Sequence, residues 1–250
     1  MARLGRCSCL IACLLATAAV FVVSACGSRD ESRSVAFESR EASDGRVLPP
    51  VADVTTARVV VLGDSLTAGL GLPPKQAYPT LLQEYIDDNG LKFTIVNAGA
   101  SGDTSAGALA RLNWALDGDV RVLIVALGGN DALRGLPVAE LTRNLSTIIT
   151  RAQVRGIAVV LAGMEAPPNY GFDYTLSFHK VYPELAKKHH VALVPFLLKD
   201  VGGIPALNQA DGIHPNAAGA RIVADNVWAA LKPVLDGQSR RVAQGRAAGQ

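Results

Sequence analysis

Two residues far apart in this sequence, a serine and a histidine, have the chemical character of a nucleophile and its base. Ser65 directly follows the apolar run 59–62 and the pair Gly63-Asp64, and His214 follows Asp211 by three residues. A serine hydroxyl becomes a good nucleophile only when a neutral imidazole accepts its proton, and a carboxylate is needed to fix the tautomer of that imidazole. Together these residue types suit acyl transfer to a serine.

Each of these residues also has a purely structural explanation. A serine after a strand often caps the next helix or turn, and an Asp-x-x-His pair can be a surface turn, a cap or half of a metal site. A metal site would need more ligands. The remaining histidines, His179, His189 and His190, lie on a lysine-rich helical stretch and at its end, where a solvated face is expected. We therefore predict no metal site.

Acyl transfer also requires hydrogen-bond donors for the oxyanion, and the loss of one donor typically costs about 100-fold to 1000-fold in rate. Gly102, in the small-residue segment 97–105, can present a backbone N–H that no side chain blocks. Asn130, in the GGND segment 128–131, can offer its side-chain amide. Each alone would be read as a loop glycine or a turn asparagine, but together with Ser65 and His214 they predict an oxyanion hole.

The elements that must position these residues alternate between strand and helix. Short aliphatic runs predict strands at 59–62, 92–96, 120–127, 157–162 and 191–196. Amphipathic or capped segments predict helices at 77–88, 105–116, 138–155, 172–189 and 216–235, the fourth of them broken or restarted near Pro183. This alternation predicts parallel βαβ units in a three-layer α/β/α sandwich, with 120–127 at the centre of the sheet. Ser65, Gly102 and Asn130 then follow strands at one edge.

Four segments, taken in order, resemble the SGNH (GDSL) hydrolase family. They are GDSL at 63–66, Gly102 within AGASGD at 98–103, GGND at 128–131 and DGIHP at 211–215, and the resemblance covers about residues 58 to 235. The segments ALRGLP at 132–137 and APPNYG at 166–171 are similar to the bacterial branch of acyl-thioesterases, lysophospholipases and arylesterases. Glu165, just before the second of these, departs from the pattern. Position 67 is Thr, so the Gly-x-Ser-x-Gly elbow of α/β-hydrolases does not fit.

The resemblance implies a flavodoxin-like sheet of five parallel strands and a serine esterase that hydrolyses carboxylic esters or thioesters, including lysophospholipids, without metal or organic cofactor. It implies Ser65 as nucleophile, His214 as base and Asp211 as orienting acid. The oxyanion hole would consist of the amides of Ser65 and Gly102 and the Asn130 side chain. Asp64 is interpreted as bracing the loop of the nucleophile rather than as a member of the triad.

The loops after the first, third and fourth strands are expected to converge beside Ser65 as an apolar acyl groove. Its candidate residues are Leu66, Leu133, Leu136, Pro137 and Tyr170. Core packing is the alternative for the leucines. Two other functions stay open: a deacetylase of cell-envelope carbohydrates, which would need a short acyl pocket, and a non-catalytic envelope lipoprotein or phosphate-binding module.

The N-terminal residues predict export. Residues 1–25 contain Arg3 and Arg6, then the apolar run 10–23, then the small residues Val-Ser-Ala before Cys26, which is typical of a signal peptide. The order Val-Ser-Ala-Cys resembles a lipoprotein box, and we favour lipidation of Cys26 over ordinary cleavage with an incidental cysteine. A bacterial envelope protein, periplasmic or membrane-anchored, is therefore expected.

Composition bounds the rest of the chain. All four cysteines lie within residues 7–26, so the exported domain has none to pair. Cleavage after Ala25 would remove Arg3 and Arg6 and no acidic residue, which leaves 22 basic and 22 acidic residues and argues against nucleic-acid binding. We expect a flexible tether at 26–56, one hydrolase domain at 57–236, a disordered tail at 237–250 and a monomer.

Overall fold

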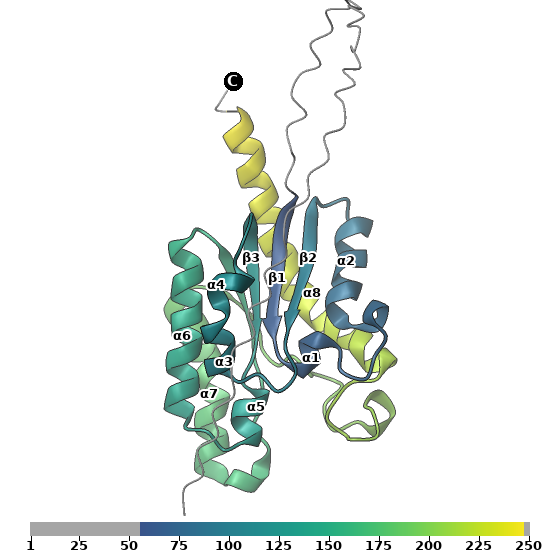
Figure 1. Cartoon of the computed structure of the whole chain (residues 1–250), viewed down its shortest axis with the longest axis vertical. Coiled ribbons are helices and arrows are strands. Elements are labelled where there is room, and N and C mark those ends of the chain that lie inside the picture. Colours follow the sequence, from purple (N-terminus) through teal and green to yellow (C-terminus); the bar gives the residue numbers. More distant parts are fainter. Residues whose placement is uncertain (1–55, 248–250) are drawn as a thin grey trace, which may run out of the picture. The chain divides into compact units, whose positions relative to one another are not determined.

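The computed structural model describes residues 56–247, so the predicted signal peptide, Cys26 and nearly all of the predicted tether lie outside the described residues. Its centre is a five-stranded sheet in the order β2-β1-β3-β4-β5 (Figure 1), and every neighbouring pair is parallel. The strands are β1 (Ala57–Gly63), β2 (Phe93–Gly99), β3 (Val120–Ala126), β4 (Ala158–Ala162) and β5 (Ala192–Val194). The five predicted strands and the central position of β3 are confirmed.

Helices cover both faces of the sheet. The helices are α1 (Ser65–Ala68), α2 (Tyr78–Asp88), α3 (Ser105–Ala110), α4 (Leu112–Ala115), α5 (Gly129–Leu133), α6 (Val138–Val154), α7 (Phe172–His189) and α8 (Ala217–Ala247), with 3-10 turns η1 (Pro74–Gln76), η2 (Pro168–Tyr170) and η3 (Pro205–Leu207). Helices α2 and α8 pack together on one face, and α3, α6 and α7 form the other layer. Residues 59–62 and 122–126 are buried, which explains their unbroken apolar sequence.

Helix α7 runs without a break through Pro183, contrary to the expected interruption. The proline removes one backbone hydrogen bond and crowds the preceding turn. Buried side chains on both sides of it, Phe178, Tyr182 and Leu185, hold the helix against the core, and the Tyr182 hydroxyl donates to the Leu127 carbonyl at 2.9 Å. Tertiary packing therefore outweighs the local effect of the proline.

The C-terminal segment also differs from the expectation. Helix α8 continues to Ala247, so residues 237–247 are helical rather than disordered. Alanine, glutamine and arginine, which favour helix, dominate that segment, and the side chains of Leu235 and Gln238 are buried at its start. The expected helix at 105–116 is divided into α3 and α4 at Arg111, and the short helices α1 and α5 were not predicted.

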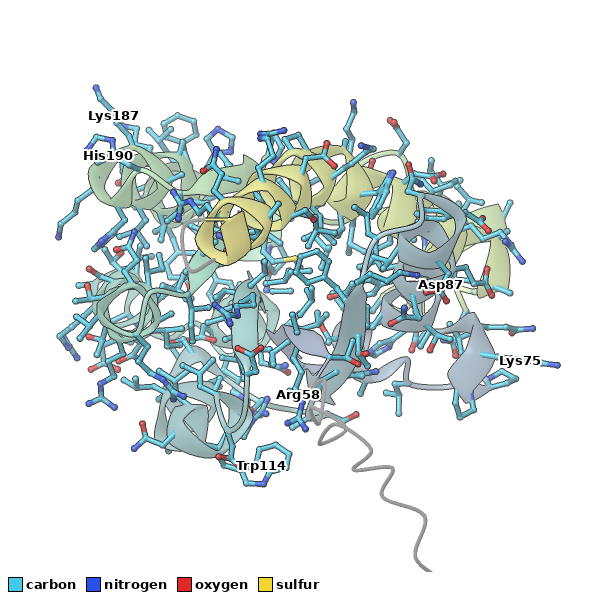
Figure 2. All side chains as sticks on the ribbon, turned by 90° about the horizontal axis from the view of Figure 1, so that it is seen from above. Arg58, Lys75, Asp87, Trp114, Lys187 and His190 are labelled. Atoms are coloured by element: carbon cyan, nitrogen blue, oxygen red, sulfur yellow. The ribbon has the colours of Figure 1, made fainter. Side chains whose placement is uncertain are left out.

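Seen from the edge of the sheet at which β1 begins, the labelled side chains of Lys187, His190 and Trp114 project outward (Figure 2). Lys187 and His190 are exposed, as expected for the end of the lysine-rich helix. Residues 56–247 contain no helix long and apolar enough to cross a membrane. The carboxyl ends of the strands, where the candidate catalytic residues follow, lie at the opposite edge of the sheet.

Candidate active site

Ser65 is the first residue of α1, at the point where β1 ends. The helix cap is not Ser65 but Asp64, whose Oδ1 accepts a hydrogen bond from the Leu66 N–H at 3.0 Å. Aspartate is well suited to this position because its carboxylate satisfies an N–H that the first turn leaves unpaired. The Ser65 hydroxyl is thereby left for another partner.

That partner is His214, 149 residues away in the sequence. The Ser65 Oγ lies 2.9 Å from the His214 Nε2, and the His214 Nδ1 lies 2.6 Å from the Asp211 Oδ2. Because the Asp211 carboxylate accepts from Nδ1–H, Nε2 is the acceptor nitrogen and faces the serine hydroxyl. The structure therefore brings the three predicted triad residues into hydrogen-bond contact.

Asp211 is held in its ionised form although it is exposed. Its Oδ1 accepts from the backbone N–H groups of Ile213 at 2.9 Å and of His214 at 3.0 Å, and its Oδ2 contacts the His214 ring. The backbone bonds, His214 first, followed by the ring contact, lower the pKa of Asp211 to about 2. A negative charge thus faces the imidazole throughout the neutral range.

The candidate oxyanion donors lie at the ends of three strands. The backbone N–H groups of Ser65 and Gly102 have no protein acceptor among residues 56–247. Gly102, in the loop between β2 and α3, has a φ of +81°, which a glycine adopts without strain. Asn130 lies in α5, directly after β3. Its Nδ2 donates to the Asp103 carbonyl at 2.9 Å and approaches the Asp64 Oδ2 only at 3.4 Å, so its second hydrogen is weakly engaged.

Several polar residues that the sequence reasoning missed hold the Gly102 loop. The Arg111 guanidinium donates to the Asp103 carboxylate at 2.7 Å and to the Gly63 carbonyl at 3.0 Å, which joins this loop to the end of β1. Arg134 donates to the Gly102 carbonyl at 2.8 Å. A further bond links buried residues, because the Ser105 hydroxyl donates to Asp131 at 2.6 Å. The only sequence signal was their closeness to the four motif segments.

The candidate groove residues divide between two regions. A cavity of about 10 Å³, room for about one water molecule, touches Ser65 and His214. Its apolar lining includes Leu66, Leu70, Leu72, Tyr78 and Leu198. Leu66 is thus the one groove candidate that lines it. Leu133, Leu136, Pro137 and Tyr170 do not line it, and the Tyr170 hydroxyl donates to the Leu133 carbonyl at 2.8 Å. Leu70, Leu72 and Leu198 carried no distinctive sequence signal.

The other histidines take part in local contacts. The His179 Nδ1 lies 2.7 Å from the Glu165 carboxylate, so the residue that departs from the family pattern joins the loop after β4 to α7. The His189 Nε2 lies 2.8 Å from the Ser146 hydroxyl. Within residues 56–247 no group of three or more His, Cys, Asp or Glu side chains is arranged to hold a metal ion.

Comparison with known proteins decides the family. The model of the GDSL-like lipase/acylhydrolase family matches residues 61–222, which include all four motif segments. The chain belongs to this family. Membership makes the protein an ester hydrolase and confirms the predicted fold, a parallel α/β sandwich.

Relatives within the GDSL family align over most of their length. The chain is 46% identical over 178 residues to the esterase TesA of Pseudomonas aeruginosa, covering 71% of this chain and 89% of that protein. It is 37% identical over 182 residues to thioesterase 1/protease 1/lysophospholipase L1 of Escherichia coli K12, covering 72% and 86%. The crystal structure of esterase EstA from Pseudoalteromonas sp., inhibited by monoethylphosphonate, shares 31% identity and a TM-score of 0.68, covering 72% and 98%.

Proposed function

We propose that the protein is a serine esterase that hydrolyses carboxylic esters and thioesters through an acyl-Ser65 intermediate. The observation that carries this proposal is the continuous contact from the Ser65 hydroxyl through the His214 ring to the Asp211 carboxylate, at 2.9 Å and 2.6 Å. Names of relatives in the same family, an esterase and a thioesterase/lysophospholipase, support the choice of ester and thioester substrates.

In the first half-reaction, the Ser65 oxygen bonds to the acyl carbon while the His214 Nε2 takes the hydroxyl proton. The carbonyl oxygen becomes an oxyanion, for which the backbone N–H groups of Ser65 and Gly102 and the Asn130 amide are the proposed donors. The tetrahedral intermediate collapses, the bond to the alcohol or thiol breaks, and His214 gives its proton to that leaving group.

In the second half-reaction, His214 takes a proton from water, whose oxygen attacks the acyl carbon of acyl-Ser65. Collapse of the second intermediate releases the carboxylic acid and returns the proton to the Ser65 oxygen. The Asp211 carboxylate stays ionised and stabilises the imidazolium in both halves.

The decisive experiment compares substitutions with covalent labelling. A fluorophosphonate probe should label wild-type protein at Ser65, and Ser65→Ala and His214→Ala should each nearly abolish hydrolysis of nitrophenyl esters. Ester hydrolysis retained by purified, folded Ser65→Ala would contradict the mechanism. Absence of labelling in folded wild-type protein would revive the non-catalytic alternative.

A carbohydrate deacetylase, which would share the triad and need a short acyl pocket, is the alternative function. Comparison of acetyl with octanoyl nitrophenyl esters separates the two functions. A preference for octanoyl supports the esterase and thioesterase proposal, and strict dependence on acetyl supports the deacetylase.

We propose further that Leu133, Leu136, Pro137 and Tyr170 form the outer wall for longer acyl chains. The exposed positions of Leu133 and Tyr170 and the bond between them support this assignment. Tyr170→Ala should lower kcat/KM for octanoyl esters more than for acetyl esters, and an unchanged chain-length profile would count against the proposal.

The proposed location is the bacterial envelope, with Cys26 as a lipidated first residue of a monomeric mature protein. The support is the sequence of residues 1–26. The intact mass of protein extracted from membranes should exceed that of the chain from residue 26 by the mass of the acyl groups. A soluble protein with unmodified Cys26 would contradict lipidation, and light scattering of the purified protein tests the monomer.

A further inference from the structure

The residues of the triad come from two separate segments of the chain, and these segments do not share a helix or pair as strands. Ser65 belongs to α1, and His214 belongs to the loop before α8, in which Asp211, Gly212 and Ile213 are exposed. Such an exposed segment has few buried side chains to hold it in place. The distance of 2.9 Å between the imidazole and the serine hydroxyl therefore depends on the contacts that fix this loop.

The backbone of Gln209 closes the base of this loop. Its N–H donates to the His214 carbonyl at 2.7 Å, and its carbonyl accepts from the Gly212 N–H at 3.0 Å. The neighbouring residues, Asn208 and Pro215, form an antiparallel bridge. The chain from 208 to 215 is thus a closed hairpin with His214 near its end, and Gln209 pairs directly with His214.

The side chain of Gln209 joins this hairpin to the segment of Ser65. Its Nε2 donates to the Pro215 carbonyl at 3.0 Å and to the Leu70 carbonyl at 2.7 Å, which uses both amide hydrogens. The Leu70 N–H in turn donates to the Ser65 carbonyl at 3.0 Å. A hydrogen-bonded path therefore runs from Ser65 through Leu70 and Gln209 to His214, independently of the contact between the hydroxyl and the imidazole.

The loop after α1 leaves room for the Gln209 amide because residue 71 is a glycine. Gly71 has a φ of +78°, and a Cβ at this position would lie 2.0 Å from the Gln209 Oε1. Any other residue would collide with the amide unless Gln209 moved. Glycine at position 71 thus has two physical reasons, its backbone conformation and the close approach of Gln209.

We propose that Gln209 is a positioning residue that sets the distance between Ser65 and His214 by joining the loop after α1 to the histidine hairpin. The inference rests on the proposed acyl-Ser65 mechanism and adds a residue outside the triad and the oxyanion hole. Loss of the amide frees the hairpin to shift, and a displacement of about 1 Å between reacting groups can cost about 100-fold in rate.

The test is Gln209→Met, which keeps the length of the side chain and removes the amide. Relative to wild-type protein, kcat for a nitrophenyl ester should fall about 10-fold to 100-fold, with KM changed less than about threefold. The rate of fluorophosphonate labelling of Ser65 should fall in parallel. A residue that served stability alone would lower the unfolding midpoint without this division between kcat and KM.

The matched control is Gln83→Met. Gln83 also bridges backbone segments with its amide, because its Oε1 accepts from the Ile95 N–H at 2.7 Å and its Nε2 donates to the Phe93 carbonyl at 3.2 Å. It lies on α2, and among residues 56–247 its side chain bonds only Asp87, Phe93 and Ile95. Gln83→Met should lower the unfolding midpoint and leave kcat within about twofold of wild type.

The outcomes separate this proposal from the mechanism beneath it. If Ser65→Ala is inactive but the kcat of Gln209→Met is within twofold of wild type, only the proposal for Gln209 is overturned. The same conclusion follows if Gln83→Met loses as much kcat as Gln209→Met. Active Ser65→Ala would overturn the mechanism and this proposal together. If Gln209→Met does not fold, Gly71→Ala disturbs the same contact from the other side, and unchanged kcat in that variant would overturn the proposal.

Discussion

Two aspartates close to the reacting atoms have opposite electrostatic environments. Asp211 is exposed, and its bonds to the His214 and Ile213 amides lower its pKa to about 2. Asp64 is only 3% exposed, and desolvation by burial raises its pKa to about 6 despite the bond from the Leu66 N–H. The first is suited to stabilise a cationic imidazole, and the second caps α1 beside Asn130 at the cost of burying a charge.

For Asp211→Asn we expect kcat to fall on the order of 1000-fold while the protein stays folded. An amide no longer favours the imidazole tautomer whose Nε2 accepts the serine proton, and it does not stabilise the imidazolium. Steady-state kinetics with a nitrophenyl ester checks this, with circular dichroism as the control for folding. A loss of less than about tenfold would show that Asp211 does not orient His214.

Asp64→Asn should stabilise the protein at pH 8. Below about pH 3 the carboxyl is mostly protonated in both the folded and the unfolded chain. As pH rises toward 6 the unfolded chain ionises first, because burial raises the pKa in the folded state, so wild-type stability falls through this window. The asparagine keeps the helix cap and carries no charge. At pH 8 we expect the free energy of unfolding of Asp64→Asn to exceed that of wild type by about 1–3 kcal/mol, because a pKa difference of one between the folded and unfolded states corresponds to about 1.4 kcal/mol.

Urea unfolding of wild type and Asp64→Asn at pH 3 and pH 8 measures this effect. The gain at pH 8 should shrink toward zero at pH 3, where residue 64 is mostly uncharged in both proteins, folded and unfolded. A stability difference of the same size at both pH values would show that the buried charge is not its cause.

At the scale of elements, the site depends on connections between strand ends. Arg111, at the junction of α3 and α4, bonds both the Gly63 carbonyl at the end of β1 and the Asp103 carboxylate in the loop after β2. One side chain thus connects the segment that precedes the proposed nucleophile with the loop of the candidate oxyanion donor Gly102. The division of the expected helix 105–116 into two short helices places Arg111 where it reaches both segments.

Arg111→Met keeps the aliphatic stem and removes both bonds. We expect a loss of about 1–3 kcal/mol in the free energy of unfolding, because a part-buried carboxylate and a carbonyl lose their partner, and a fall in kcat of about tenfold. Urea unfolding and ester kinetics measure the two effects. Arg121→Met, which breaks the more exposed pair of Arg121 with Asp119, is the control, and it should change stability by less than about 1 kcal/mol. Unchanged kcat in Arg111→Met would separate this contact from catalysis.

At the scale of the whole domain, the candidate active site and the C-terminal end of α8 lie at opposite edges of the sheet (Figure 1). The far end of α8 lies at the edge where β1 begins, and α1 with Ser65 lies at the other (Figure 1). A chain that ends at Asp236 should therefore keep kcat within about twofold of wild type. Its far-UV ellipticity at 222 nm should be less negative than that of the full chain, because residues 237–247 are helical. Equal ellipticity per molecule would restore the original expectation of a disordered tail.

The sequence by itself determined the alternation of five strands with the longer helices, the parallel sheet and the family, and it supplied the candidates for the triad and the oxyanion hole. Those features follow from local hydrophobic patterns and from short motifs, which are visible in the linear sequence without knowledge of the fold. Only the tertiary structure decided that α7 passes through Pro183 unbroken, that α8 extends to Ala247, and which leucines line the cavity at Ser65. It alone revealed the contacts of Arg111 with Gly63 and of Gln209 with Leu70, because a hydrogen bond between segments more than 40 residues apart depends on how the chain folds back on itself, and local sequence does not encode that geometry.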